Sequence, residues 1–272
     1  MWEAYFFRDT LWRKKKAPQK EIRKSVRGGR FGRFLICMYI YGKNPIREAL
    51  SQAKHTVSRL FVSRRRGGRD IEEIVRLALS LGIGVKEVPD RVLKDLVGNQ
   101  NHQGVVAEVE FVYEPLDNLF DYPAVLVLDH IQDPHNLGAL ARSAAAFGVK
   151  GIVIAQNRAV HVTPAVVKVS EGNIFKVDVS IVINLRRAIE EFKKRGFWVY
   201  GADMGGRSIW DVSFAERVLL LLGSEGKGIS RLMRESCDEV VAIPMEPKVE
   251  SLNVSVSGAI LMYELYRRSR HG

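Results

Sequence analysis

The sequence has only two cysteines, Cys37 and Cys237, among its 272 residues. Two thiols cannot form a disulfide framework or a four-thiolate zinc site, and their scarcity favours a reducing, cytoplasmic setting. Histidines do not supply the missing metal ligands, because His130 and His135 are five residues apart, a spacing that suits no pair on one helix face. We therefore expect no bound metal.

Long hydrophobic runs are also missing. No stretch approaches the 18 consecutive apolar residues that indicate a transmembrane helix, so we expect no association with a membrane. Residues 34–41 are apolar, but the run is short and no small-residue cleavage site follows it, so we expect no signal peptide. Apolar residues nevertheless make up 46% of the chain, which is enough to bury a sizeable core.

Positive charge is concentrated at the start of the chain. The net charge is +11, and residues 1–37 alone hold eleven basic and three acidic side chains with little apolar periodicity. We predict a disordered basic arm there, with a role in gripping RNA phosphates. In the alternative interpretation this segment is an upstream extension of the reading frame, and Met38, where regular patterning begins, is the natural start.

Residues 38–112 alternate short helical and strand patterns. Apolar positions at helical spacing predict a helix over 71–81, and the whole segment is typical of a compact α/β domain. A glycine-containing basic loop interrupts it, and two interpretations of this loop stay open, namely contact with RNA phosphates and a solvated loop. Its arginines are Arg64, Arg65, Arg66 and Arg69.

Residues 124–272 follow a proline-bracketed segment, 113–123, which we interpret as a linker. The continuous apolar run at 124–128 is typical of a strand buried on both faces. Strands and helices then alternate, which predicts an α/β domain with a mostly parallel sheet and helices on both faces. The expected strands are 124–129, 151–155, 197–202, 217–222 and 239–243, and the main helices are 137–147, 185–195 and 253–268.

Three segments follow expected strand ends and are rich in Gly, Pro, Ser and Asn: 129–142, 223–228 and 243–253. Ligands of parallel sheets bind beyond the carboxyl ends of the strands, so we expect one composite site there. The glycine segment GSEGKG fits neither a P-loop nor a dinucleotide fingerprint. Taken alone, it is as well explained as a generic glycine turn.

Taken together, these segments resemble the signature motifs of the SpoU–TrmH (SPOUT) family of RNA ribose 2′-O-methyltransferases. The matching segments are DPHNLGALARSA at 133–144, LGSEGKGI at 222–229, and IPM at 243–245 with SLNVSV at 251–256. Upstream, YGKNPI and NHQGVVA resemble the two ends of the substrate-binding domain of the RlmB-type subgroup. The resemblance covers residues 38–268 and leaves the basic arm outside.

This resemblance implies a SPOUT fold with a trefoil knot in the C-terminal region, preceded by an L30e-like RNA substrate-binding domain. It implies a homodimer that uses S-adenosylmethionine as methyl donor and needs no metal. The subgroup implies methylation of a guanosine ribose in large-subunit (23S) ribosomal RNA. Two alternatives stay open: the same reaction on transfer RNA, and a catalytically silent RNA-binding module.

The family motifs assign a donor site to Gly223, Ile243 and Leu252, with Met245 and Asn253 beside them. Glycine permits close backbone approach to a ligand, and the apolar side chains can flank an adenine ring. Ordinary core packing is the alternative for Ile243 and Leu252. For Asn253 the alternative is the N-cap of the last helix.

The same motifs make Arg142 the activator of the ribose hydroxyl. A guanidinium hardly ever loses its proton, so we expect Arg142 to stabilise the forming alkoxide and to grip a phosphate, rather than to act as a base. Asn136 and Ser251 are expected to orient Arg142 or the ribose. Glu225 is expected to pair with an arginine, or alternatively to cap a helix at 226–229.

Overall fold

The computed structural model describes residues 21–24, 34–52, 56–64, 68–98, 100–224, 226, 228–249 and 251–271. Two compact units divide the chain between Val112 and Tyr113. The smaller unit contains a five-stranded sheet, and the larger unit contains a six-stranded sheet. No helix among these residues combines the length and the hydropathy needed to cross a bilayer.

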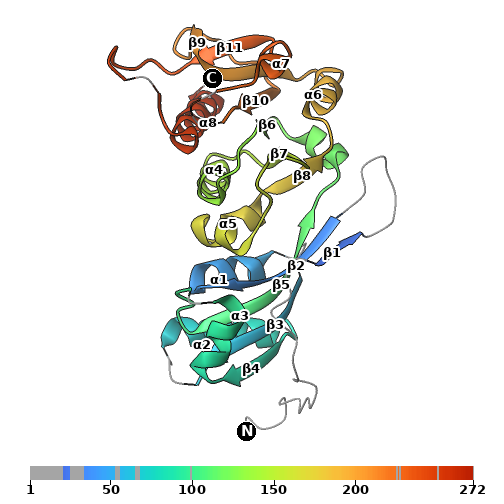
Figure 1. Ribbon diagram of the computed structural model, residues 1–272, viewed down its shortest axis with the longest axis vertical. Coiled ribbons are helices and arrows are strands. Elements are labelled where there is room, and N and C mark those ends of the chain that lie inside the picture. Colours follow the sequence, from blue (N-terminus) through green and yellow to red (C-terminus); the bar gives the residue numbers. More distant parts are fainter. Residues whose placement is uncertain are drawn as a thin grey trace. The chain divides into compact units, whose positions relative to one another are not determined.

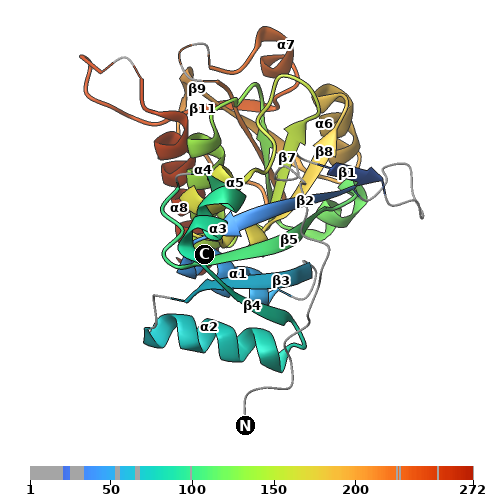
Figure 2. The same ribbon diagram turned by 60° about the horizontal axis from the view of Figure 1, so that its bottom comes forward.

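The smaller unit has the strand order β1-β2-β5-β3-β4, with β3 antiparallel to β5 and parallel to β4. Figure 2 shows its sheet together with the helices of the same unit. Its elements are β1 (Glu21–Lys24), β2 (Phe34–Tyr41), α1 (Lys43–Ser51), β3 (Thr56–Ser63), α2 (Arg69–Ser80), β4 (Gly84–Val88), α3 (Asp90–Val97) and β5 (Val105–Tyr113).

Apolar periodicity explains the packing of this unit. The expected helix over 71–81 corresponds to α2, which buries Ile71, Ile74 and Ala78 at helical spacing. Helix α3 is anchored by Leu93, which is fully buried in an apolar cluster with Phe61 and other residues of the sheet.

Parts of the predicted disordered arm are β-strands, so that prediction is wrong for residues 21–24 and 34–37. Strand β2 begins at Phe34 and pairs antiparallel with β1, with Ile22 opposite Ile36. The physical reason is a period of two that starts upstream of Met38, since Ile36, Met38 and Ile40 are all buried. Residues 1–20 and 25–33 of the arm lie outside the described residues.

The larger unit has the strand order β11-β9-β10-β6-β7-β8, and every neighbouring pair is parallel. This confirms the predicted mostly parallel sheet. Its strands are β6 (Ala124–Leu128), β7 (Gly151–Ala155), β8 (Asp178–Val182), β9 (Trp198–Ser208), β10 (Val218–Leu222) and β11 (Glu239–Ala242). Its helices are η1 (Leu116–Asp121), α4 (Pro134–Ala146), α5 (Pro164–Val169), η2 (Asn173–Lys176), α6 (Leu185–Lys193), α7 (Arg231–Arg234) and α8 (Val254–His271).

Helices cover both faces of this sheet, as predicted (Figure 1). Residues of η1, α6 and α7 join alternate strand residues such as Val127 and Leu219 in one continuous apolar cluster. Helices α4, α5 and α8 lie on the other side, where α4 packs against both α5 and α8. Strands β6, β7 and β10 are almost completely buried, which accounts for their continuous apolar runs.

Two segments of the larger unit differ from the sequence-based expectation. Strand β8 was not predicted, because Asp178 and Ser180 interrupt its apolar pattern although Val179 and Val182 are buried. Within the expected linker at 113–123, Leu116 and Leu119 are fully buried on helix η1. This stretch therefore packs as part of the core rather than as an exposed connection.

Candidate functional site

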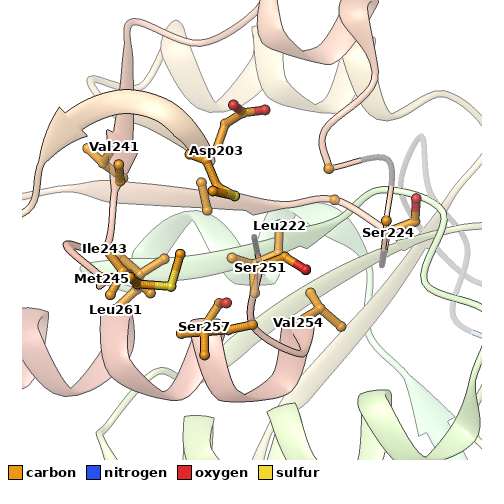
Figure 3. Close-up of a pocket in the computed structure, with 17 residues that line it drawn as sticks. Asp203, Leu222, Ser224, Val241, Ile243, Met245, Ser251, Val254, Ser257 and Leu261 are labelled. Atoms are coloured by element: carbon orange, nitrogen blue, oxygen red, sulfur yellow. The ribbon is translucent and has the colours of Figure 1, made fainter. Parts of the chain in front are cut away.

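A pocket of about 430 Å³ lies at the ends of strands β10 and β11, beside residues 202–204 of β9 and the first turns of helix α8 (Figure 3). Its volume is within the range of about 300–1,000 Å³ that is typical of small-molecule sites. It is lined by Ala202, Asp203, Met204, Leu222, Gly223, Ser224, Gly226, Gly228, Val241, Ala242, Ile243, Met245, Ser251, Leu252, Val254, Ser257 and Leu261. Two of the three predicted loop segments therefore meet in one cavity.

One side of the pocket is apolar. Figure 3 shows Ile243, Met245 and Leu261 grouped together, with the hydroxyl-bearing Ser251 and Ser257 next to them. Ile243 and Leu252 are only half-buried and line the cavity, so simple core packing does not describe their environment. An apolar wall with a few polar groups suits a flat heterocycle.

The glycine segment forms the second wall, and Gly223 has no room for a side chain. A Cβ atom placed on Gly223 would lie 2.0 Å from the carbonyl carbon of Gly228, because the loop folds back on itself. The backbone N–H of Gly228 donates to the carbonyl oxygen of Ser224 at 2.9 Å, and φ is +63° at Gly228. The loop therefore presents bare backbone to a ligand.

Asn136 and Asn253 are brought together, but neither lines the pocket. The Asn253 side-chain amide donates to Oδ1 of Asn136 at 3.0 Å, and its own Oδ1 accepts from the backbone N–H of Ser255 at 2.9 Å. Asn253 is thus the N-cap of α8, the alternative role considered for it. Through this pair the first and third motifs are in direct contact.

Arg142 is exposed on helix α4, away from the residues that line the pocket. Among the described residues its guanidinium makes no hydrogen bond or ion pair, which leaves all of its donors for a ligand. Asp133 is the N-cap of α4, and its Oδ1 accepts from the backbone N–H of His135 at 2.9 Å. This hydrogen bond is the main cause that lowers the pKa of the Asp133 carboxyl.

Asp129, at the end of β6, is a buried carboxylate that connects three segments. Its Oδ2 accepts from the backbone N–H of Ser230 at 3.1 Å, and its backbone N–H donates to the carbonyl oxygen of Leu222 at 2.8 Å. Its Oδ1 lies 2.6 Å from Nδ1 of His130. The end of β10, from which the glycine segment departs, is therefore held against β6.

Asp203 lines the pocket and was not predicted. Residues 203–206 follow the expected strand 197–202 and contain two glycines. The criterion that selected the other three segments, a glycine-rich stretch after a strand end, would also have selected this one. Asp203 forms an ion pair with Arg234, with 2.9 Å between Oδ1 and Nη1.

Three predicted residues, Glu225, Arg65 and Arg66, lie outside the described residues. Arg64 and Arg69 are exposed on either side of the basic loop. The alternative role expected for Glu225 is to cap a helix at 226–229. The described residues of that stretch, 226, 228 and 229, are not helical, and the next helix, α7, begins at Arg231, so this alternative is wrong. Within the described part of the chain, no three His, Cys, Asp or Glu side chains are grouped as metal ligands.

Two family profiles match this chain. The SpoU rRNA Methylase family matches residues 123–263, and the domain described as RNA 2′-O ribose methyltransferase substrate binding matches residues 39–115. This chain belongs to the SpoU rRNA methylase family. The family segment contains the whole described pocket, so the pocket is a property of the methylase unit.

Relatives of this SpoU-family chain are similar over most of their length. A Bacillus subtilis protein named as a TrmH family tRNA/rRNA methyltransferase, YacO, is 40% identical over 239 residues, covering 85% of this chain and 95% of that protein. A Mycobacterium avium protein named as an uncharacterized tRNA/rRNA methyltransferase is 37% identical, covering 85% of this chain and 77% of that protein. Both names leave the choice between the two RNA classes open.

Solved structures agree with the fold. The SpoU methyltransferase AviRb from Streptomyces viridochromogenes superposes with a TM-score of 0.75 at 26% identity, covering 85% of this chain and 89% of AviRb. AviRb in complex with the cofactor AdoMet gives 0.73 at 27% identity, covering 87% and 92%. The predicted family, fold class and enzyme class, an S-adenosylmethionine-dependent RNA methyltransferase, are confirmed.

Proposed function

We propose that this SpoU-family enzyme transfers the methyl group of S-adenosylmethionine to the ribose 2′-hydroxyl of a guanosine in large-subunit (23S) ribosomal RNA. The observation that carries this proposal is the pocket, which gathers Gly223, Ile243, Met245 and Leu252 from two separate motifs. Their position beyond the ends of parallel strands is where such sheets bind ligands.

The pocket fits the donor by shape and chemistry. The apolar side chains of Ile243 and Met245 form a surface for the adenine ring, and the bare backbone at Gly223 allows close approach of the nucleoside. When bound, the donor supplies a sulfonium methyl group that is already electrophilic, so the reaction requires no metal. Ser251 contributes a hydroxyl to the lining of the same pocket.

Arg142 is the proposed catalytic residue. Its exposed guanidinium can bind the RNA phosphate and the developing negative charge on the ribose oxygen, while phosphate or water accepts the proton. Asn136 lies on the same helix, α4, as Arg142 and accepts a hydrogen bond from Asn253. It can therefore position Arg142 or the ribose. We propose that Glu225 pairs with an arginine.

Several observations favour ribosomal RNA over transfer RNA. Structures described as transfer RNA enzymes, one from A. aeolicus and one for methylation of C/U34, cover only 57% and 55% of this chain. The additional unit at 34–112 matches a substrate-binding domain and exposes Arg64 and Arg69 beside a basic loop. We propose that these arginines, with Arg65 and Arg66, contact RNA phosphates.

Three further features belong to the same proposal: a trefoil knot in the methylase unit, a homodimeric state and a cytoplasmic location. The first two follow from the family resemblance. The third is supported by the two cysteines, Cys37 and Cys237, which do not form a disulfide bond with each other.

Methylation mapping tests the target. Ribose methylation is mapped on total RNA from cells with and without the gene, and the purified protein is then given labelled donor with 23S transcripts or transfer RNA. Loss of one 23S guanosine methyl group, with transfer to that transcript, is the expected result. Loss of a transfer RNA methyl group supports the alternative substrate, and binding of RNA without any transfer supports a silent module.

A further inference from the structure

Strand β9 is not paired with its neighbour β11 over the residues that line the pocket. The pairing runs from Val240 opposite Gly201 directly to Val241 opposite Arg207, so residues 202–206 of β9 have no partner on β11. A Cβ atom on Gly206 would lie 2.6 Å from the backbone of Val240, so the return of the strand requires glycine. Irregularities of this kind re-aim side chains next to binding sites.

This irregularity places the side chain of Asp203 in the wall of the pocket. Ala202, Asp203 and Met204 all line the pocket, and Asp203 is the one charged side chain among its described lining residues. Figure 3 shows Asp203 at the rim, on the opposite side of the cavity from Ser257 and Leu261. The negative charge is therefore separated from the apolar wall.

The two oxygens of this carboxylate are used differently. Oδ1 accepts from Nη1 of Arg234 at 2.9 Å and from the backbone N–H of Gly205 at 3.1 Å. Oδ2 faces the glycine segment, 3.2 Å from where a Cβ atom on Gly228 would lie, and within the described residues it has no hydrogen-bond donor. The carboxylate side chain retains 24% of its exposure. One oxygen is therefore fixed and the other is available to a ligand.

We propose that Oδ2 of Asp203 binds the α-ammonium group of the amino-acid tail of the methyl donor. This inference rests on the proposed function, since it assumes that S-adenosylmethionine fills the pocket. S-adenosylmethionine carries two cationic groups, the sulfonium and the α-ammonium. Only the ammonium has N–H groups that can donate a hydrogen bond to a carboxylate oxygen. The adenine ring occupies the apolar side, so the tail extends toward the rim where Asp203 lies.

Arg234 is a positioning residue in this arrangement. It does not line the pocket, and its contact with Oδ1, together with that of Gly205, fixes the orientation of the carboxylate. Replacing Arg234 therefore weakens donor binding less than removing the Asp203 charge.

The test compares three ligands by calorimetry with the full-length protein. S-adenosylmethionine and S-adenosylhomocysteine both carry the ammonium group, whereas 5′-methylthioadenosine lacks the amino-acid tail. Asp203→Asn is nearly isosteric and removes the charge. We expect it to weaken binding of the first two ligands roughly 10- to 100-fold, as for loss of a hydrogen bond between charged groups, and to leave the third within about twofold.

The matched control is Glu239→Gln. Glu239 lies on β11, with its Oε1 3.5 Å from Nη1 of Arg207 on β9, and its carboxylate does not line the pocket. This variant should bind all three ligands as the parent protein does, and circular dichroism should show both variants folded. Equal weakening of all three ligands by Asp203→Asn, or no weakening, overturns the inference. A parent protein that binds none of them overturns the proposed function itself.

Discussion

The side-chain amide of Asn253 donates a hydrogen bond to Oδ1 of Asn136, across 117 residues of sequence. The donor caps the last helix and the acceptor is buried on the first helix after β6. The contact thus joins the segment expected to hold the methyl donor to the helix that carries Arg142. We therefore expect one shared framework to position the methyl donor and Arg142, the proposed catalytic residue.

Replacing Asn253 separates its two structural roles. Asn253→Ser keeps an N-cap oxygen but loses the amide that reaches Asn136, so we expect a loss of about 1 kcal/mol in the free energy of unfolding. Asn253→Ala loses the cap as well and should cost roughly 1 kcal/mol more. Urea denaturation measures both values, and equal losses for the two variants would contradict this division.

Arg142→Ala should lower turnover at least about 100-fold, the scale for removal of one group that stabilises a developing oxyanion. Because Arg142 does not line the pocket, the dissociation constant for S-adenosylmethionine should stay within about twofold. Single-turnover methyl transfer and calorimetry provide the two measurements. Arg142→Lys is the matched control for charge, and we expect only partial activity because lysine lacks the planar fork. Parallel loss of donor binding would make Arg142 a structural residue.

Gly223→Ala should weaken donor binding at least about tenfold, because the added methyl group collides with the backbone of Gly228 and displaces the loop. Gly148→Ala is the control. Gly148 has a φ of +74° with open space around its Cβ position, so alanine there strains only the backbone. It should cost about 1 kcal/mol of stability and leave binding intact. If both variants bind the donor normally, the close approach at Gly223 has no role in the site.

The last helix should give the protein an acid-sensitive contribution to stability. Hydrogen bonds from Arg267 and Arg268 lower the pKa of the Glu264 carboxyl to about 2, and Arg268 also donates to the carbonyl oxygen of Ile209 at 2.8 Å. Since the folded pKa lies below the unfolded one, this contribution is present above about pH 4.5 and is lost as the pH falls toward 2.

Glu264→Gln tests this pH dependence. At pH 7 we expect the variant to lose about 1–3 kcal/mol of unfolding free energy, and the difference from the parent protein should shrink as the pH is lowered from 5 to 3. Denaturant unfolding at each pH provides the measurement. A difference that stays constant over this range would show that the charge of Glu264 is not the stabilising feature.

Much of the site was predictable because its residues follow strand ends in the sequence. Gly223, Ile243, Met245, Ser251 and Leu252, from two of the three predicted segments, all line one pocket, whereas no residue of the first segment, 129–142, lines it. Strand ends are recognisable from apolar runs, and parallel strands bring their carboxyl ends to the same edge. The sequence pattern failed at β8, where polar residues hide a buried strand, and at β2, where the basic surroundings concealed a period of two.

Motifs and local periodicity involve residues close together in the chain, so the family, the parallel sheet and two of the segments that line the pocket could be predicted from the sequence. The entry of Asp203 into the pocket and the contact of Asn136 with Asn253 could not, because they depend on how distant segments pack. The position of Asp203 depends on a shift of register between β9 and β11, and the asparagine contact depends on the packing of α4 against α8. Pairing partners far apart in the chain are chosen by the packing of the whole sheet, which local patterns do not encode.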